Sequence, residues 1–351
     1  MIYILCDSKF RESVWCKMIL NGIEDSLKKK RRKYSVVDSI DGSLLSSECG
    51  VFLVGSNDKW INSKVELCNT AEIIPIVVCN QRGRICKGMY HGVSADIEYI
   101  MEQICSFLTL HNCSNAVFYG LNEASASDRG KAEYFTKYFG ENSVIIENNG
   151  SLEDAYSRFE KHSDTVDAVV CANDFFAVHL VKKLLENNPK LLSRLKIVSS
   201  VKTKLSFLYE KYIVSFETDF ELIGKTASEL YEFIVDKPFL SGITVNVRCK
   251  SFTDDGVINS IEHHEAFLDN DAFYQDREIV EALKVDNLIN DCKGDDFDIL
   301  KLLCAGKTYS QIAEACYMSE SNVKYHVKKY IETLGIKNRE ELQAVLSEYI
   351  I

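Results

Sequence analysis

Two patterns of apolar positions alternate through residues 1–253. Short apolar runs are typical of buried strands, and longer stretches with apolar residues three or four positions apart are typical of helices. The predicted strands are 2–6, 51–54, 73–79, 116–120, 143–147, 168–171, 196–200 and 212–216. The predicted helices are 14–30, 97–110, about 130–140, 152–161, 175–186, 203–210 and 219–235. Strands separated by helices predict parallel sheets with helices on both faces, and this length of chain exceeds one core, which predicts two lobes.

The pattern changes twice before the C-terminus. Residues 243–252 alternate in polarity like an edge strand, whereas residues 254–294 are rich in acids and carry apolar residues at irregular spacing. We therefore predict a two-lobed α/β domain at 1–253, a partly helical connector at 254–294 and a small all-α domain of four helices at 295–351. Within the first domain, we assign residues 1–113 and 219–237 to lobe 1 and residues 114–217 and 240–253 to lobe 2.

The C-terminal domain contains the start and stop signals of four short helices. N-capping residues and terminating glycines recur at intervals that suit such helices. They are the capping box of Thr308 and Gln311, the N-caps Ser319 and Asn338, and the glycines Gly306 and Gly335. The turn at 316–318 joins the second helix to the third, and this arrangement lets a helix enter the major groove of DNA.

The third helix of this domain has an apolar face and a basic face. Val323, Val327, Ile331 and Leu334 share one stripe and are expected to face the core. The opposite face carries the candidate DNA-binding residues, which are Ser321, Lys324, Tyr325, Lys328 and Lys329. An exposed tyrosine among lysines favours a groove over the alternative, a solvated helix of an ordinary bundle.

The segment 298–342 resembles the LuxR-type helix-turn-helix. The resemblance rests on Val-Lys-Tyr-His-Val-Lys at 323–328 and on Leu-Gly-Ile-x-Asn-Arg-x-Glu-Leu at 334–342. It departs in the first helix, where acids and Phe297 replace the family's Thr-x-x-Glu-x-Glu. The resemblance implies that Lys324, Tyr325 and Lys328 enter the major groove and that the fourth helix forms a dimer contact.

Residues 1–253 resemble the sensor domain of the lac-repressor/galactose-repressor family, which has a periplasmic-binding-protein type I fold. The resemblance is carried by Cys-Ala-Asn-Asp at 171–174, Ile-Pro-Ile-Val-Val at 74–78 and the segment 217–227. It implies a cleft for a small-molecule effector, either a sugar or another small polar metabolite. The residues that match ligand-contacting positions of the family are Asn80, Arg129, Asn173 and Thr218. Ser-Ser-Val-Lys at 199–202 replaces the family's Gly-x-Asp-Asp, which argues against a simple sugar.

Two of these ligand candidates have plain structural alternatives. Arg129 can form a surface ion pair with Asp128 or Glu133. Asn173 can serve as the N-cap of the helix that follows it, since asparagine is favoured there.

Composition narrows the class of protein. The net charge is −11, so any DNA contact must be local to a basic surface. The 13 cysteines include no Cys-x-x-Cys pair, which is typical of reduced thiols in the cytoplasm. The apolar run at 1–6 is too short for a signal peptide, and no stretch reaches the roughly 18 apolar residues of a membrane helix. We therefore expect a cytoplasmic protein without membrane association.

Motifs of common enzymes are missing from the sequence. It contains no GxGxxG, no P-loop, no GxSxG and no HExxH. His263, His264 and Glu265 form a lone cluster in the connector, which is a weak indication of metal binding. We expect no catalytic residue, no cofactor and no metal.

These patterns together predict a one-component transcriptional regulator that acts as a homodimer. An effector in the N-terminal cleft would modulate the binding of double-stranded DNA by the C-terminal helix-turn-helix. One alternative is a phosphorylation-controlled response regulator, but only Asp7 follows the first strand and the N-terminal domain is too long. The other is a solute-binding protein without a regulatory role, which DNA binding would exclude.

Overall fold

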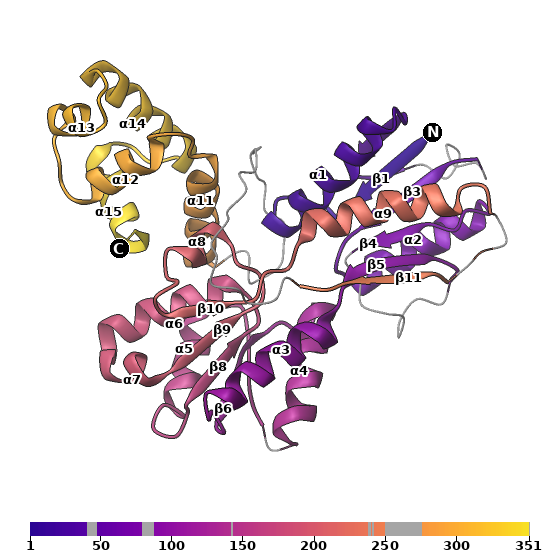
Figure 1. The fold of residues 1–351 in the computed structure, drawn as a ribbon, viewed down its shortest axis with the longest axis horizontal. Coiled ribbons are helices and arrows are strands. Elements are labelled where there is room, and N and C mark those ends of the chain that lie inside the picture. The colour runs from indigo at the N-terminus through magenta and orange to yellow at the C-terminus, as the bar shows by residue number, and fades with distance from the viewer. Residues whose placement is uncertain are drawn as a thin grey trace.

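The computed structural model describes residues 1–40, 48–78, 88–141, 143–237, 240, 242–249 and 276–350. Figure 1 shows two lobes, each built on one sheet, and a helical C-terminal domain beside the second lobe. The strand pairs in both sheets are parallel, as the sequence predicts. Among the described helices, none combines the length and the apolar character needed to cross a membrane.

Lobe 1 is a six-stranded sheet with helices on both faces. In sheet order, its strands are β11 (Thr244–Val247), β5 (His91–Ala95), β4 (Ile76–Val78), β3 (Gly50–Val54), β1 (Ile2–Cys6) and β2 (Tyr34–Val37). Side chains alternate between faces along a strand, so Ile4 packs under α1 (Val14–Lys29) and α9 (Phe220–Ile234), whereas Leu5 packs under α2 (Asp58–Thr70).

Lobe 2 is a five-stranded sheet that is also covered on both faces. In sheet order, its strands are β10 (Ile213–Ser215), β9 (Lys196–Ser199), β8 (Ala168–Cys171), β6 (Ala116–Leu121) and β7 (Val144–Glu147). One face packs against α5 (Leu152–Glu160), α6 (Asp174–Asn187), α7 (Pro189–Arg194) and α8 (Lys204–Phe207). The other face packs against α3 (Ile97–Leu110) and α4 (Ala126–Phe139).

Two lobe assignments made from the sequence are wrong. Residues 240–253 were assigned to lobe 2, but β11 pairs with β5 in the sheet of lobe 1, and Cys249 beyond it joins the core of lobe 2. Helix α3 lies in the range assigned to lobe 1, but it packs against α4 and the sheet of lobe 2. The chain therefore crosses between lobes after β5, after Phe216 and after β11. Chain order does not show these crossings, because an element joins the sheet that buries its apolar face.

Helices α1 and α9 approach each other closely because glycines face each other at their contact. A Cβ atom on Gly224 would lie 2.1 Å from the carbonyl oxygen of Ile19, and one on Gly22 would lie 2.2 Å from that of Glu221. No other residue type fits at this separation. The Ser228 hydroxyl donates to the carbonyl of Ile23 at 3.2 Å in the same contact. These residues, about 200 positions apart in sequence, thus join the two chain segments of lobe 1.

The C-terminal domain has the four predicted helices and the predicted caps. They are α12 (Asp296–Cys304), α13 (Tyr309–Ala315), α14 (Glu320–Leu334) and α15 (Arg339–Tyr349). Thr308 and Gln311 form the full capping box, and Ser319 and Asn338 accept from the backbone of the helices they precede. Gly306 and Gly335 have φ values of 71° and 68°, which is the left-handed region that favours glycine.

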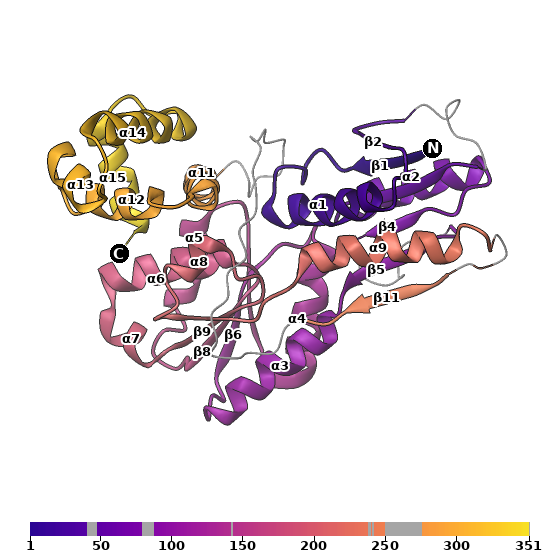
Figure 2. The same cartoon turned by 45° about the horizontal axis from the view of Figure 1, so that its top comes forward.

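The connector ends in α11 (Arg277–Asp291), which lies between lobe 2 and the C-terminal domain (Figures 1 and 2). One hydrophobic core runs without interruption from lobe 2 through α11 into the C-terminal domain. Residues of α11 such as Ile279, Val285 and Leu288 are buried in it. The described part of the connector is therefore a packed bridge, and the C-terminal domain is docked on lobe 2.

Candidate ligand cleft and nucleic-acid interface

A pocket lies between the two lobes, beside the chain crossings. Lobe 1 contributes the end of β5 and the start of α9, and lobe 2 contributes α3, α4 and the loop after β9. The lining residues are Ser94, Ala95, Ile97, Ile100, Ser127, Lys131, Ser200, Val201, Thr218 and Phe220. Thr218 is the one predicted ligand residue in this lining. Its hydroxyl donates to the carbonyl of Ser200 at 2.8 Å, and the hydroxyl of Ser200 is buried with no hydrogen-bond partner among the described residues.

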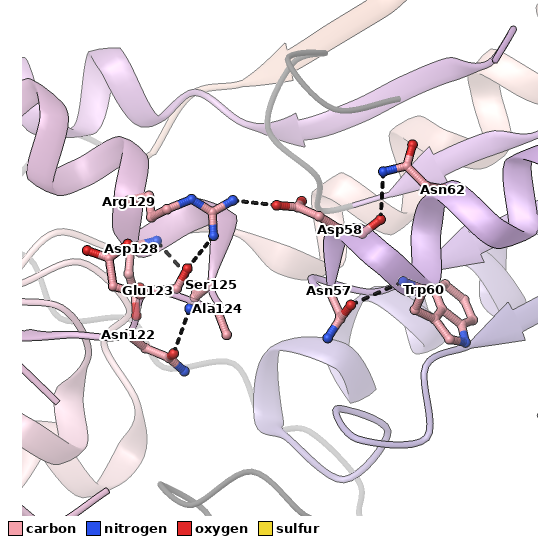
Figure 3. Close-up of polar contacts among 10 residues, drawn as sticks. All are labelled: Asn57, Asp58, Trp60, Asn62, Asn122, Glu123, Ala124, Ser125, Asp128 and Arg129. Carbon is pink, nitrogen blue, oxygen red and sulfur yellow. Dashed lines mark hydrogen bonds and ion pairs between the residues drawn. The ribbon is translucent and has the colours of Figure 1, made fainter. Parts of the chain in front are cut away.

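Arg129 joins the lobes, as Figure 3 shows. Its guanidinium forms an ion pair with Asp58 at the start of α2 and donates to the carbonyl of Glu123. The partner is therefore neither Asp128 nor Glu133. Helix α4 also begins earlier than predicted, because the Ser125 hydroxyl accepts from the amide of Asp128 and caps it. Arg129 thus stands in the first turn of α4 at the rim of lobe 2, and it holds an acid of lobe 1.

A buried lysine was missed by sequence reasoning. Lys131 is only 6% exposed, and its ammonium donates to the carbonyl of Ala172 at 2.8 Å and lies 3.9 Å from Oδ1 of Asp128. Burial raises the pKa of Asp128 to about 6 despite this neighbour. The sequence analysis assigned Lys131 no role, because nothing in the local sequence distinguishes it from a surface lysine of a helix. Only the packing of α4 in the structure shows that Lys131 is buried and lines the pocket.

Asn173 acts as a helix cap in this structure. Its side-chain oxygen accepts from the amides of Phe175 and Phe176 at 3.1 and 3.3 Å. Asn173 is therefore the N-cap of α6, as the alternative interpretation of the sequence held. Its contact with an effector stays a prediction. Asn80, the remaining predicted ligand residue, lies outside the described residues.

Behind Asn173, a buried acid connects the cleft side of lobe 2 to α8. Asp174 accepts from the hydroxyl of Ser199, from the amide of Thr203 at 2.6 Å and from the hydroxyl of Ser206 at 2.5 Å. Ser199 immediately precedes Ser200 of the pocket. The side chain of Asp174 therefore holds the segment 199–206 in one conformation.

A second buried acid connects α8 to α11. Asp286, which is fully buried, accepts from the amide of Leu205 at 2.8 Å and from the side chain of Asn290 at 3.2 Å. Lys204 donates to the carbonyl of Asn290 at 3.2 Å. Burial raises the pKa of Asp286 to about 7. This junction is the polar part of the contact between the sensor and the bridge helix.

We expect the Asp286 junction to weaken as pH rises. The folded chain holds the Asp286 proton more tightly than the unfolded chain does, because the folded pKa is about 7 and the ordinary value is 3.8. The stabilising contribution is thus complete below about pH 4 and is lost as pH rises to about 7. Asp286→Asn should remove this part of the pH dependence, on the order of 2–4 kcal/mol, in urea unfolding of the whole chain.

Asp295→Asn, the same change of charge at an exposed residue, is the control for that experiment. Parallel pH profiles of unfolding free energy for the Asp286→Asn variant and the parent would contradict the prediction.

The predicted DNA-binding side chains all lie on one exposed face of α14. Ser321, Lys324, Lys328 and Lys329 are exposed, and Tyr325 is 66% exposed. Val323, Val327 and Leu334 are buried as predicted, and Tyr330 is buried with them while Ile331 is only partly covered. Figures 1 and 2 show α13 and α14 on the side of the domain that faces away from the sheet of lobe 2. The face is therefore open for docking.

An acid of α12 holds α14 through two side-chain hydrogen bonds. Asp296 accepts from Nδ1 of His326 at 2.7 Å and from the hydroxyl of Tyr330, both on α14. The first helix differs from the LuxR pattern by its acids. One of these acids, Asp296, thus orients the candidate recognition helix α14. Sequence reasoning missed this role, because 30 residues separate Asp296 from His326.

Part of the surface of α15 is covered by other elements of the same chain. Leu342, Leu346 and Tyr349 are buried. The hydroxyl of Tyr209 in lobe 2 donates to the carbonyl of Glu348 at 3.2 Å, and the ammonium of Lys182 lies 4.0 Å from the centre of the Tyr349 ring. The dimer contact that the resemblance assigns to α15 therefore stays a prediction, to be made by its remaining exposed residues.

Comparison with known proteins gives one family match. Residues 296–346 match the model of the family described as bacterial regulatory proteins, luxR family. The match covers α12 to α14 and most of α15, so the predicted LuxR-type domain is confirmed. No curated protein matches the chain.

Solved structures match the two-lobed region. The transcriptional regulator CelR in complex with cellobiose has 12% identity and a TM-score of 0.61, over 72% of this chain and 83% of that one. The lac repressor dimer bound to operator and the anti-inducer ONPF has 13% identity and a TM-score of 0.58, over 71% and 91%.

A LacI family transcriptional regulator from Enterococcus faecalis with bound ribose has 14% identity and a TM-score of 0.57, over 71% of this chain and 96% of that one. At these identities the likeness concerns the fold. The chain thus joins a LuxR-type DNA-binding domain at its C-terminal end to a region with the two-lobed fold of lac-repressor-type sensors.

Proposed function

We propose that this chain is a transcriptional regulator whose inter-lobe cleft binds a small polar effector and thereby modulates DNA binding by α14. The observation that carries the proposal is the physical continuity between the two parts. A LuxR-type domain with an open basic face is docked through α11 on lobe 2 of a sensor fold, and one core spans the junction.

The route from cleft to DNA runs through two buried carboxylates. Asp174 holds the segment 199–206, which begins at the pocket, and Asp286 holds the amide of Leu205 to α11. On its other side, α11 contacts the C-terminal domain: Lys284 donates to the carbonyl of Leu334 at 3.5 Å, and Tyr349 donates to Glu281 at 3.3 Å. An effector that shifts segment 199–206 would therefore shift α11 and reorient α14, provided that it binds the two lobe arrangements with different affinity.

The effector class follows from the polar groups of the cleft. Two of the similar solved structures carry cellobiose and ribose. The pocket lining here offers Lys131, Thr218 and the hydroxyl of Ser200, which has no hydrogen-bond partner among the described residues. Arg129 stands between two lining residues of α4, Ser127 and Lys131. These groups suit a compact ligand with hydroxyl or carboxylate oxygens. An anionic group that pairs with Arg129 would displace Asp58 and so change the contact between lobes. Two chains acting as a dimer on a two-fold DNA site complete the proposal.

A two-step experiment tests the function. A thermal-shift screen of sugars, sugar acids, amino acids and nucleosides identifies the effector, because ligand at about 100 times Kd adds roughly 2.7 kcal/mol of stability. Duplexes enriched from a random library by the purified chain are then tested in gel-shift assays with and without that effector. We expect a specific duplex whose affinity changes with effector. Failure to enrich any duplex would contradict the DNA-binding proposal.

Arg129→Ala should abolish most of the ligand-induced thermal shift. Losing a hydrogen bond from a charged group costs about 1.5–3 kcal/mol of affinity, and the Asp58 contact is lost as well. Arg158→Ala is the control, since Arg158 forms an ordinary ion pair within α5 at 2.9 Å from Asp154. An unchanged ligand shift in the Arg129→Ala protein would exclude Arg129 from the effector site.

A further inference from the structure

Three side chains that commonly bind metals converge where α5, α6 and α11 meet, outside the cleft and the DNA-binding face. They are Glu153, His179 and Glu278, and one ligand atom of each lies within 4.8 Å of the other two. Glu153 is in the first turn of α5, and Glu278 is in the first turn of α11. The cluster therefore joins lobe 2 to the bridge helix.

His179 is buried, and its ring has no hydrogen bond of good geometry to any described residue. It is 4% exposed, and neither ring nitrogen makes a hydrogen bond to a described residue. Its Nε2 lies 3.2 Å from Oε2 of Glu278, close enough for an ion pair but without the direction of a hydrogen bond. Two ligands that each lie about 2.1 Å from one metal ion are roughly 3.0–3.4 Å apart when their angle is near tetrahedral or square. The observed nitrogen–oxygen distance fits this arrangement.

A second buried polar atom belongs to the same core of lobe 2. The hydroxyl of Tyr119 is fully buried and has no hydrogen-bond partner among the described residues. Burial above all raises the pKa of Tyr119, and nearby negative charges, including those of Glu153 and Glu278, add to the effect. Buried polar groups are almost always paired in native structures. Among the described residues, His179 has the carboxylate of Glu278 as a close polar neighbour and makes no hydrogen bond of good geometry, which leaves its ring nitrogens available to a further partner.

We propose that Glu153, His179 and Glu278 form a binding site for one divalent transition metal ion, with Zn²⁺ as the best match. Imidazole nitrogen and carboxylate oxygen are both ordinary zinc ligands, and three protein ligands leave the fourth position of a tetrahedral site open for water.

Both basic and acidic side chains surround the cluster, and one of the basic ones must move before a metal ion can bind. The ammonium of Lys183 lies 2.6 Å from Oε2 of Glu153 and has to leave when the metal binds. The adjoining pocket is lined by three basic residues, Lys182, Lys183 and Arg277, and by four acids, Glu186, Glu278, Glu281 and Glu348. With Glu153 added, acids outnumber bases, so the field at the site favours a cation.

A bound ion would fasten α11 to lobe 2 beside the DNA-binding domain. The start of α11 is already connected to lobe 2 here, because Asp276 caps α11 and also accepts from the amide of Leu152, the first residue of α5, at 3.2 Å. Glu348 and Tyr349 of α15 line the adjoining pocket. Metal occupancy would thus set how firmly the bridge helix is held, independently of any effector in the cleft.

The test uses the full chain, stripped of metal with EDTA. Co²⁺ binding is followed by visible absorption and Zn²⁺ binding by competition calorimetry. We expect one ion per chain and a higher melting temperature when it is bound. His179→Gln should abolish binding, and Glu278→Gln should weaken it at least about tenfold. Glu210→Gln removes the same charge at an exposed residue outside this pocket and should leave binding unchanged.

Absence of stoichiometric binding would overturn the proposal, and so would equal affinity in the parent and both ligand variants. Another contradicting outcome is thiolate charge-transfer absorption that accounts for all the bound Co²⁺, because the ion would then be bound by cysteines. If His179→Gln does not fold, the double variant Glu153→Gln, Glu278→Gln decides, since both of those side chains are exposed. Full metal affinity in that double variant would reject the site.

Discussion

Replacing both Tyr325 and Lys328 by alanine is expected to lower affinity for the selected duplex by on the order of 100-fold or more, with no change in melting temperature. A base-reading contact contributes about 1–3 kcal/mol, and both side chains project from the open face of α14. Neither belongs to the packed stripe of Val323, Val327 and Leu334, so folding should not suffer. Loss of the lysine should also reduce the dependence of affinity on salt.

The matched control removes the same two residue types from another exposed helix surface. Lys137 and Tyr138 of α4 are both exposed, and their double alanine variant should bind the duplex like the parent. Gel-shift titrations at two salt concentrations, with circular dichroism melts of every variant, measure both effects. Retained affinity in the Tyr325→Ala, Lys328→Ala protein would show that another face of the domain contacts DNA.

Val327→Asp is expected to unfold the DNA-binding domain. Val327 is 1% exposed in the core that α14 shares with its neighbours. A carboxylate placed there without a partner costs several kcal/mol, which is comparable to the whole stability of a small domain. Because this core continues through α11 into lobe 2, the unfolding transition of the sensor should also shift to lower temperature.

Lys328→Asp places the same carboxylate one residue further along, at a side chain that is 77% exposed. Both variants should lose DNA binding, but only Val327→Asp should lose helical signal and become sensitive to protease in α12 to α15. Equal melting temperatures for the two variants and the parent would mean that the stripe is not the core of the domain.

The elements predicted with the correct bounds share a physical cause. Strands such as 2–6 and 168–171 and the helix 97–110 are strongly apolar or strongly periodic, so local pattern and burial agree. The capping box at Thr308 and the glycine at 335 act within a few residues. Such signals need no knowledge of the rest of the chain.

The elements that were missed lack such signals. β2 is an edge strand that follows a basic run and has no fully buried residue, and β5 consists of small and polar residues that include His91 and Gly92. Helix α2 buries only Ile61, Val65 and Cys68, and its polar residues mask the period. Each is an element because a neighbouring strand or core supplies partners that the local sequence does not show.

The candidate sites divide in the same way. The basic face of α14 follows from helical period alone, and all five predicted side chains are exposed on it. In the cleft, Thr218 lines the pocket between the lobes, while its contact with an effector stays a prediction. The partner of Arg129 is Asp58, 71 positions earlier. Lys131, Asp174, Asp286 and the cluster at His179 could not be found from spacing, because each acts on residues from distant elements.

The sequence by itself determined that the chain has parallel α/β lobes followed by a helix-turn-helix with a basic helix, since period, caps and turn residues act over short distances. Only the tertiary structure decided that β11 joins lobe 1 and α3 joins lobe 2, that Arg129 meets Asp58, and that α11 packs the DNA-binding domain against the sensor. These outcomes depend on which distant apolar faces and buried charges satisfy one another best, and that balance of burial and pairing is a property of the folded chain.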